Sequence, residues 1–524
     1  WNNVKTITDH NISLSGDYDV TGNIGLTFVV GATSNSQVFD QNGVASTGQQ
    51  VFNVLRHFNF ENQDEIQYYQ KRNVSGVYGQ AELDYDRFVY LTLAARTDWV
   101  SNLSEENRSI TYPSASVSFL PTKVFDGLKS DLVNMLKVRV GLGASADFPF
   151  GYPIASRLNL DTQSFIRNGA AIVANTSSSQ LGNPALKPER MDELEFGIEG
   201  TFLNRRLGLD LSIYNKATKD LRIDRPLDPS TGYTTTVTNI GKIENKGAEV
   251  DLSFIWVQAQ QPGALEWTSN LNWSTNEAKV VDLGADTDYI TYAGGSGYYN
   301  VAAPGYSLGT IVGSAINRDA SGNYKVLSNG FYDIKYGTDP EENTIGDATP
   351  NFLLNFGNRI TYKDFALNFL ISHVNGGDIM SMTTSVLLGR GLVEDTVDRE
   401  QSFILPGVNP SGQPNTTQIV NSDFYFYNVL YGPGENRIYD GSVIRLQEVS
   451  LTYNLPKSIL DSTPFGSLSL SASGFNLWYD AYNTPDSVNF DPNVAGTGIG
   501  NGRGFDWLNG PSSKRYGLSL KATF

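Results

Sequence analysis

The sequence of 524 residues has no cysteine, which excludes disulfide bonds, thiolate metal sites and cysteine nucleophiles. It has three histidines, His10, His57 and His373, which are too few to predict a histidine-based catalytic centre. It lacks the run of about eighteen apolar residues that a membrane-spanning helix needs, so such a helix is excluded. Its net charge of −17 argues against nucleic acid as a partner, because nucleic-acid phosphates need a basic surface.

Glycine and aromatic residues are plentiful, with 51 Gly, 27 Tyr and 27 Phe against 4 Met. This balance suits strands and turns better than helices. In the last stretch, residues 513–524, every second residue is apolar or aromatic. A period of two indicates a strand with one apolar face. The apolar positions of this stretch are Tyr516, Leu518, Leu520, Ala522 and Phe524.

The final residue of this strand, Phe524, is itself aromatic. In outer-membrane barrels, lipid-facing and lumen-facing residues alternate and aromatic girdles mark both interfaces, so this ending is typical of a barrel. An ordinary amphipathic strand fits the same twelve residues, and only repetition of the pattern separates the two interpretations.

The pattern repeats along the whole chain. Alternating segments come in pairs, and the connections between them are short and long in turn. Short turns are predicted at residues 86–87, 204–205 and 363–364. Long connections are predicted at residues 33–72, 99–109, 146–189, 220–243, 281–350, 377–440 and 478–512.

About fifteen strands result, with short turns at one end and long loops at the other, as in outer-membrane barrels. A soluble β-sandwich would have short turns at both ends. The sequence therefore predicts an all-β, antiparallel transmembrane β-barrel with residues 1–524 in one domain. One short helix is expected within residues 121–134, where Val124, Leu128 and Leu132 have helical spacing.

The strand count also predicts that barrel strands precede Trp1. Bacterial single-chain barrels have an even number of strands and both chain ends in the periplasm. Neighbouring strands of an antiparallel barrel run in opposite directions, so the first and last of an odd number of strands run the same way. The last strand runs toward the periplasm, and we therefore expect the first strand to run toward it too. We therefore expect the C-terminal portion of a larger barrel, because the strand at 12–18 needs a hydrogen-bonded neighbour within lipid.

Several motifs resemble those of TonB-dependent outer-membrane transporters. Residues 183–197, NPALKPERMDELEFG, resemble the entry strand of that family, and residues 244–250, ENKGAEV, resemble its N-K-G-E strand. Other stretches resemble the SusC/RagA branch found in Bacteroidota. They are GDATPNF at 346–352 with the turn YKDF at 362–365, DGSVIRLQEVSLTYNLP at 440–456, and the tail that ends in Phe524.

The resemblance implies a 22-stranded barrel plugged by an N-terminal domain. About seven strands, the plug and the energy-coupling peptide are then expected before Trp1. A non-enzymatic protein of the bacterial outer membrane, with extracellular loops and a periplasmic C-terminus, is implied. The implied partners are a SusD-like surface lipoprotein, the TonB complex, outer-membrane lipid and the barrel-assembly machinery. The residues expected to signal to that machinery are Tyr516, Leu518, Leu520 and Phe524.

Aromatic residues in the long loops are candidates for binding a substrate or a partner, because exposed rings stack on sugars and lose little entropy on binding. The alternative is that they pack between neighbouring loops. These residues are Tyr298, Tyr299, Trp478, Tyr479, Tyr482, Phe505 and Trp507.

Acidic residues alternate with the apolar ones on several strands and predict a polar inner wall. Contact with basic groups of a plug is the favoured role for this wall, and selection of a solute is the less favoured one. The residues are Glu193, Glu195, Glu199, Asp210, Glu249 and Asp251.

No cofactor is predicted. The acidic loop stretches at 286–288, 339–342 and 486–491 could supply oxygen ligands for Ca²⁺, but they lack the EF-hand spacing, and solvated carboxylates are the simpler interpretation. His373 continues the outward register of Phe369 and Ile371, and an interfacial position near the rim is favoured over a catalytic one.

Two functions remain open at this point. The first is energy-coupled import of a bulky nutrient, an oligosaccharide or a peptide, with long loops that gather it. The second is a structural scaffold of the same ancestry within a larger outer-membrane assembly or secretion complex. A soluble adhesin or β-rich enzyme is a distant third.

Overall fold

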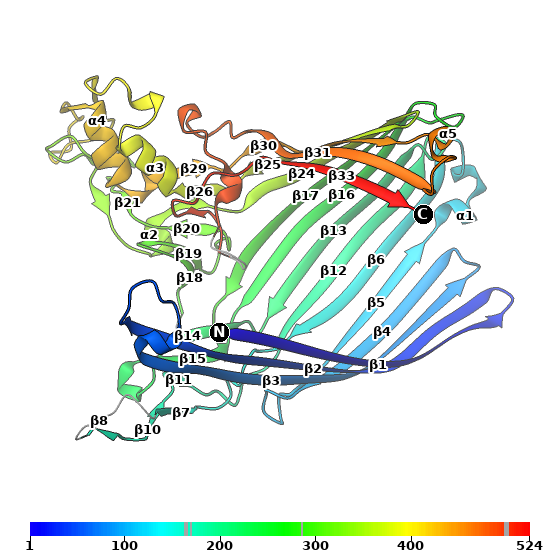
Figure 1. The fold of residues 1–524 in the computed structure, drawn as a ribbon, viewed down its shortest axis with the longest axis horizontal. Coiled ribbons are helices and arrows are strands. Elements are labelled where there is room, and N and C mark those ends of the chain that lie inside the picture. The colour runs from blue at the N-terminus through cyan, green and yellow to red at the C-terminus, as the bar shows by residue number, and fades with distance from the viewer. Residues whose placement is uncertain (162–165, 168–169, 285–286, 497–501) are drawn as a thin grey trace. The chain divides into compact units, whose positions relative to one another are not determined.

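The computed structural model describes residues 1–161, 166–167, 170–284, 287–496 and 502–524 (Figure 1). Among these residues, fifteen strands form one sheet, and each strand lies beside the strands that precede and follow it within this set. This confirms the predicted all-β class and strand count. The strands are β1 (Asn2–Thr21), β2 (Ile24–Gln49), β3 (Phe60–Tyr85), β4 (Val89–Val100), β5 (Ser109–Phe119), β6 (Val133–Asp147), β12 (Glu189–Phe202), β13 (Leu207–Lys219), β16 (Lys242–Val257), β17 (Glu266–Asp282), β24 (Pro350–Tyr362), β25 (Phe365–Gly376), β30 (Val443–Asn454), β31 (Ser467–Asp480) and β33 (Arg515–Thr523).

The short turns between strands contain residues with positive φ, the left-handed region of the backbone. Tyr362 pairs with Phe365, so residues 363–364 form the predicted two-residue turn, and Lys363 has φ 53°. A positive φ at such a turn matches the right-handed twist of the flanking strands. Between β3 and β4, Tyr85 pairs with Val89. The turn there has three residues, 86–88, and not the predicted two.

The prediction of a long connection at residues 33–72 is wrong. β2 runs on to Gln49 and β3 begins at Phe60, so only residues 50–59 connect them. Asp40 pairs with Tyr69 and Asn42 pairs with Gln67 within this extension. The extension has no apolar face for periodicity to reveal, because backbone hydrogen bonds rather than buried side chains define it.

The helix predicted within residues 121–134 is shorter than expected. It consists of α1 (Pro121–Val124) followed by a single 3₁₀ turn, η2 (Asp126–Leu128). Leu132 immediately precedes β6 and belongs to neither element. The helical spacing of Val124, Leu128 and Leu132 therefore predicted helical structure correctly at Val124 and Leu128 but not at Leu132.

The chain divides into two compact units. Unit 1 comprises Trp1–Leu120, Arg139–Glu195 and Lys216–Lys242, and unit 2 comprises Pro121–Val138, Phe196–Asn215 and Ile243–Phe524. The loops of unit 1 contain η1 (His57–Asn59), β7 (Leu158–Asp161), β8 (Ile166–Arg167), β9 (Ala170–Ala171), β10 (Ala174–Ser177), β11 (Gln180–Leu181), β14 (Arg222–Pro226), η3 (Pro229–Thr231) and β15 (Thr235–Asn239).

The long loops of unit 2 are folded into small sheets and helices. Figure 1 shows them beyond one end of the unit 2 strands, while α1 and α5 lie at the other end with the short turns. We call this assembly the loop layer, and it comprises the described residues 283–284, 287–349, 377–442, 481–496 and 502–514. Its elements are β18 (Ile290–Gly295), β19 (Tyr298–Ala302), β20 (Thr310–Val312), β21 (Ala315–Ile316), β22 (Ile334–Lys335), α2 (Pro340–Asn343), β23 (Thr344–Asp347), β26 (Asp378–Ser381), α3 (Met382–Gly389), η4 (Glu394–Thr396), β27 (Ser402–Ile404), β28 (Gln418–Val420), α4 (Asn421–Phe424), the π-helix η5 (Tyr425–Leu430), η6 (Gly434–Arg437), β29 (Ile438–Asp440), η7 (Asp486–Val488), η8 (Pro492–Val494) and β32 (Phe505–Asp506). The helix α5 at the opposite end is Lys457–Leu460.

The strands expose apolar side chains at every second position. Leu142 on β6, Leu194 on β12 and Leu470 on β31 are 57, 49 and 49% exposed. Exposure of so many large apolar side chains to water would be unfavourable, whereas contact with the acyl chains of lipid is favourable for them. Across the described residues, no helix has the length and apolar content needed to cross a membrane.

Candidate functional site

The loop layer has an apolar core of its own. Tyr298 from β19, Ile311 from β20 and Met380 from β26 meet Phe505 from β32, so three separate loops contribute to one cluster. Phe505 is 0% exposed and Tyr298 is 6% exposed. The expectation of exposed rings is wrong for these two residues, because they pack between loops, which was the alternative.

The other five loop aromatics have more accessible surface. Trp507 packs half-buried against the same cluster, with its ring stacked on Phe505 at 5.9 Å. Tyr299 and Tyr479 are half-buried, and the Tyr479 hydroxyl donates to the Asn489 carbonyl at 2.8 Å. Trp478 and Tyr482 are exposed. A binding role for these five stays a prediction.

Polar side chains fix the loops to one another. Asp506 accepts hydrogen bonds from the Ser381 hydroxyl at 2.8 Å and the Thr383 amide at 2.9 Å, at the beginning of α3. The buried Arg437 donates to the Val429 carbonyl at 2.9 Å and to the Leu430 carbonyl, which are end groups of η5. These bonds satisfy helix-end groups that would otherwise be unpaired away from water.

A buried ion pair joins the last loop to a strand. Arg445 at the beginning of β30 and Asp491 before η8 form a bidentate pair, and their side chains are 4 and 2% exposed. Burial by itself would raise the pKa of Asp491, but hydrogen bonds from Arg445, Ser512 and the Asn493 amide hold it below its ordinary value.

His373 lies near the end of β25 and contacts aromatic residues. Its Nε2 is 3.0 Å from the Tyr482 hydroxyl, and its ring meets Phe352 edge to face at 5.3 Å. These aromatic contacts fit an interfacial position near the rim, which stays a prediction.

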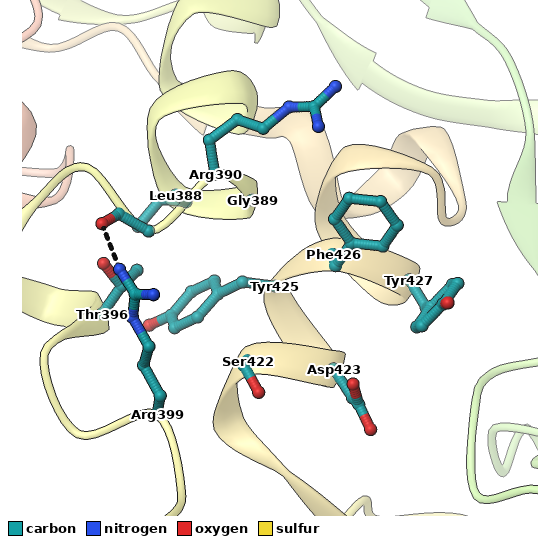
Figure 2. Close-up of a pocket in the computed structure, with 11 residues that line it drawn as sticks. Leu388, Gly389, Arg390, Thr396, Arg399, Ser422, Asp423, Tyr425, Phe426 and Tyr427 are labelled. Atoms are coloured by element: carbon teal, nitrogen blue, oxygen red, sulfur yellow. Dashed lines mark hydrogen bonds between the residues drawn. The ribbon is translucent and has the colours of Figure 1, made fainter.

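The loop between β25 and β30 encloses a pocket of about 240 Å³, which we call the arginine pocket (Figure 2). Arg399 Nη2 donates to the Gly391 carbonyl at 3.0 Å, as the dashed line in Figure 2 marks. Arg390 lies over the Phe426 ring at 5.7 Å and donates to the Tyr431 hydroxyl at 3.2 Å. The lining residues are Leu388, Gly389, Arg390, Gly391, Thr396, Arg399, Ser422, Asp423, Tyr425, Phe426 and Tyr427.

Sequence reasoning did not find the arginine pocket. Its residues come from α3, η4, α4, η5 and the connecting segments that hold Arg390, Gly391 and Arg399, and no spacing rule relates them. The available signal was local, a dense aromatic run at 425–431, YFYNVLY, preceded by a Gly-Arg-Gly segment at 389–391.

Unit 1 has a larger pocket in its own loops, of about 560 Å³. Phe150 and Tyr152 line it, with Arg72 over the Phe150 ring at 5.0 Å and Arg157 over the Tyr152 ring at 5.8 Å. The Tyr152 hydroxyl donates to the Lys71 carbonyl on β3 at 2.9 Å, which fixes the ring. This pocket was also not predicted.

Three of the acidic residues predicted on the inner wall pair with cations of adjacent strands. Glu193 is 3.3 Å from Lys216, Glu195 is 3.2 Å from Arg139, and Glu199 is 3.2 Å from Lys137. Asp251 accepts a hydrogen bond from Asn272, Asp210 is half-buried on β13, and Glu249 is exposed on β16. The partners of these three glutamates thus include groups of the sheet itself, and contact with a plug stays a prediction.

The acidic loop stretches have local structural roles. Asp339 accepts from the Glu341 amide and caps α2, and Asp491 pairs with Arg445. Asp286 lies outside the described residues. Within the part of the chain that the structure describes, no three His, Asp or Glu side chains are grouped as a metal ion would need.

The sequence model of the family described as TonB dependent receptor-like, beta-barrel matches residues 2–375 of this chain. The chain belongs to this family. The TonB-dependent receptors are outer-membrane proteins without enzymatic activity, so the predicted membrane location and the predicted lack of catalysis are confirmed.

Among curated TonB-dependent receptors, P3 of Formosa agariphila is 26% identical over 506 residues, which cover 90% of this chain and 46% of P3. P26 of the same organism is 25% identical and covers 100% of this chain and 53% of P26. The chain therefore spans about half the length of these relatives. SusC of Bacteroides thetaiotaomicron is 26% identical over 221 residues, 40% of this chain and 21% of SusC.

The solved structure of the RagAB peptide transporter has the same fold, with a TM-score of 0.75. The match covers 100% of this chain and 56% of that chain at 16% identity. Together with SusC, it confirms the resemblance of this TonB-dependent receptor to the SusC/RagA branch.

The C-terminal strand of the receptor ends beside the connection of residues 455–466, which holds α5, at the end of the strands that carries the short turns. Phe524 contacts Phe465, in the connection between β30 and β31, with 5.2 Å between ring centroids. In outer-membrane barrels the short turns are periplasmic, so the loop layer, at the other end, faces the cell exterior. Tyr516, Leu518 and Leu520 are exposed as a lipid-facing row requires, and their role as an assembly signal stays a prediction.

Proposed function

We propose that this chain is part of the barrel of a TonB-dependent importer that takes up a bulky nutrient, an oligosaccharide or a peptide. The observation that carries the proposal is the loop layer, because it holds an ordered, pocket-bearing surface beyond the ends of the lipid-facing strands. Rigid elements that present pockets at one end of a barrel suit capture of a solute before its passage.

The proposal includes partners from outside the chain. We propose that a SusD-like surface lipoprotein meets the loop layer and that the TonB complex acts through an N-terminal plug. The likeness in fold to the RagAB peptide transporter and the relation to SusC support a receptor of this kind. The plug, its coupling peptide and the preceding barrel strands stay predictions.

Growth on single purified nutrients tests import. A strain that lacks the whole gene should lose growth on one glycan or peptide class, and a strain without TonB should lose it too. Restoring the gene should restore growth. Unchanged growth on every nutrient would contradict the proposal.

Isolation of the native complex separates import from the scaffold function. Import predicts that a SusD-like lipoprotein co-purifies with the receptor in detergent. Recovery of secretion or assembly factors in its place, together with unchanged growth, would favour the scaffold.

A further inference from the structure

The lipid-facing surface of unit 1 has a groove of about 480 Å³, which we call the strand groove. It lies across β4, β5, β6 and β12, which are neighbours in the sheet in this order. Leu93 on β4 and Leu142 on β6 line it and are 49 and 57% exposed. Leu93 pairs with Ala115 on β5, so these two side chains lie on the same face. The groove is hollow here because the other apolar side chains of this face that line it are small, namely Ala115, Pro113 and Ala144. The remaining uncharged lining residues alternate with these and contribute main-chain atoms.

Charged side chains line one end of the strand groove. Arg190 and Asp192 are on β12, in the register of Leu194, which is 49% exposed. The Arg190 Nε donates to Asp192 Oδ1 at 2.7 Å, and the Lys219 Nζ on β13 donates to Asp192 Oδ2 at 2.9 Å. Because both cations hold oxygens of one carboxylate, their charged groups lie together at this end of the groove. We call Arg190, Asp192 and Lys219 the rim cluster.

The rim cluster has one positive charge in excess. Among the described residues, Asp192 is the one carboxylate within ion-pair distance of either cation. The Arg190 guanidinium bonds Asp192 through Nε, so the donors of its two Nη groups face a ligand site, as do two of the three donors of Lys219. The two side chains are 38 and 50% exposed. An anionic group is therefore the electrostatic complement of this cluster.

The rim cluster lies at the height of the outer lipid headgroups. Asp192 is ten residues from Phe202, where β12 ends at its short turn. Ten residues at about 3.3 Å each, on a strand tilted by about 40°, rise about 25 Å, which is the height of the apolar band of an outer-membrane barrel. Leu93 is four residues from Val89, where β4 begins after its short turn, and by the same geometry it rises about 10 Å. The strand groove therefore descends from the outer headgroups into the apolar layer.

A lipid of the outer leaflet has the matching chemistry along its length. Its phosphate lies at the headgroup level, where Arg and Lys donate charge-assisted hydrogen bonds to phosphate oxygens. Its acyl chain lies in the apolar layer, where a hollow in the protein surface gives it more atomic contacts than a flat wall does. Asp192 keeps the two cations together and still leaves a net charge of one to meet the phosphate.

We propose that the strand groove binds one phosphate-bearing lipid of the outer leaflet. The phosphate lies on Arg190 and Lys219, and one acyl chain lies in the groove between Leu93 and Leu142. The site is on the opposite face of the sheet from the polar inner wall. It therefore goes beyond the proposed import and holds equally for a scaffold.

The test is native mass spectrometry of the full receptor, purified in detergent and mixed with three probes. The probes are phosphatidylglycerol, a diacylglycerol with the same acyl chains, and glycerol phosphate without acyl chains. Phosphatidylglycerol should be retained about fivefold more than the diacylglycerol, because the rim cluster attracts only the charged headgroup. Glycerol phosphate should be retained least, because it does not fill the groove. Equal retention of phosphatidylglycerol and either of the other probes would overturn the proposal.

Variants locate the lipid in the strand groove. Arg190→Gln and Lys219→Gln should each lower retention of phosphatidylglycerol about fivefold, and Arg190→Lys should keep most of it because the charge remains. Ala144→Leu should also lower retention, because the larger side chain fills the groove and leaves the rim cluster in place. Lys216→Gln is the matched control, since Lys216 is also on β13 but pairs with Glu193 on the other face at 3.3 Å. An equal loss in Lys216→Gln would overturn the proposal.

Two further measurements separate lipid binding from misfolding and from association of receptor copies. The variants should keep the circular dichroism of the wild type, and loss of retention only where the circular dichroism changes would count against the site. The oligomer mass should be the same in wild type and Ala144→Leu. A changed mass with unchanged lipid retention would mean that the groove is a contact between two receptor copies, and the lipid assignment would be wrong.

Discussion

In the strands of this receptor the apolar side chains are exposed at alternate positions, whereas in the loop layer they are buried against one another. Leu142 and Leu470 on strands are about half exposed, but Ile311, Met380 and Phe505 in loops are 0% exposed. The difference follows from the surrounding solvent, because lipid accepts apolar side chains and water does not. One chain therefore has two hydrophobic arrangements, one facing outward and one facing inward.

Removal of a loop-core side chain should have the largest effect. Phe505→Ala should destabilise the loop layer by about 3–5 kcal/mol, since it leaves a cavity among Tyr298, Ile311 and Met380. Hydrogen exchange should rise in the loops of unit 2 and stay unchanged in its strands. Trp478→Ala, at an exposed position, is the control. Equal exchange in loops and strands would remove the contrast between the two regions.

A charge on the lipid-facing surface should have the next largest effect. Leu142→Arg on β6 should destabilise the folded barrel by about 2–4 kcal/mol if the side chain lies near the bilayer midplane. Denaturant titration in lipid vesicles measures this. Gly143→Arg is the matched control, because a Cβ at Gly143 meets no atom within 4 Å and its side chain points to the other face. A larger effect at Gly143 would reverse the assignment of faces.

The buried pair of the last loop should make the loop layer sensitive to acid. Because the folded pKa of Asp491 is lowered, its stabilising effect is complete above the unfolded value of about 3.9 and is lost as the pH falls through the folded value. Asp491→Asn should cost about 1–3 kcal/mol at neutral pH and remove this part of the acid sensitivity. Thermal unfolding of the loop layer from pH 7 to pH 3 provides the measurement. An Asp491→Asn profile parallel to the wild type would exclude this role.

The pairs on the polar face of the strands should matter least. Lys137 and Glu199 are 3.2 Å apart with side chains 34 and 39% exposed, and such pairs contribute less than about 1 kcal/mol. Glu199→Gln, assayed like Leu142→Arg, should be nearly neutral. A cost above about 2 kcal/mol would mean that this face is shielded from water.

The strands were predictable because lipid and lumen impose a period of two on the sequence, as Leu194 and Glu195 show side by side on β12. The polar parts of β2 and β3 were not, since residues such as Asn42 and Gln67 pair through the backbone alone. The burial of Phe505 and the close packing of Arg399 against Gly391 could not be predicted, because they depend on contacts between separate loops or turns. In a single sequence, the only sign of such contacts is a high content of tyrosine, phenylalanine and glycine, which does not identify the residues that meet.

The 26 residues of β2 and of β3, at about 3.3 Å each, make a ribbon roughly 85 Å long, more than twice what the apolar layer of a bilayer requires. Its outer half stands in water, held by the ladder that pairs Gln49 with Phe60. A large solute that approaches the receptor from outside would therefore meet this paired ribbon before it reached the lipid headgroups.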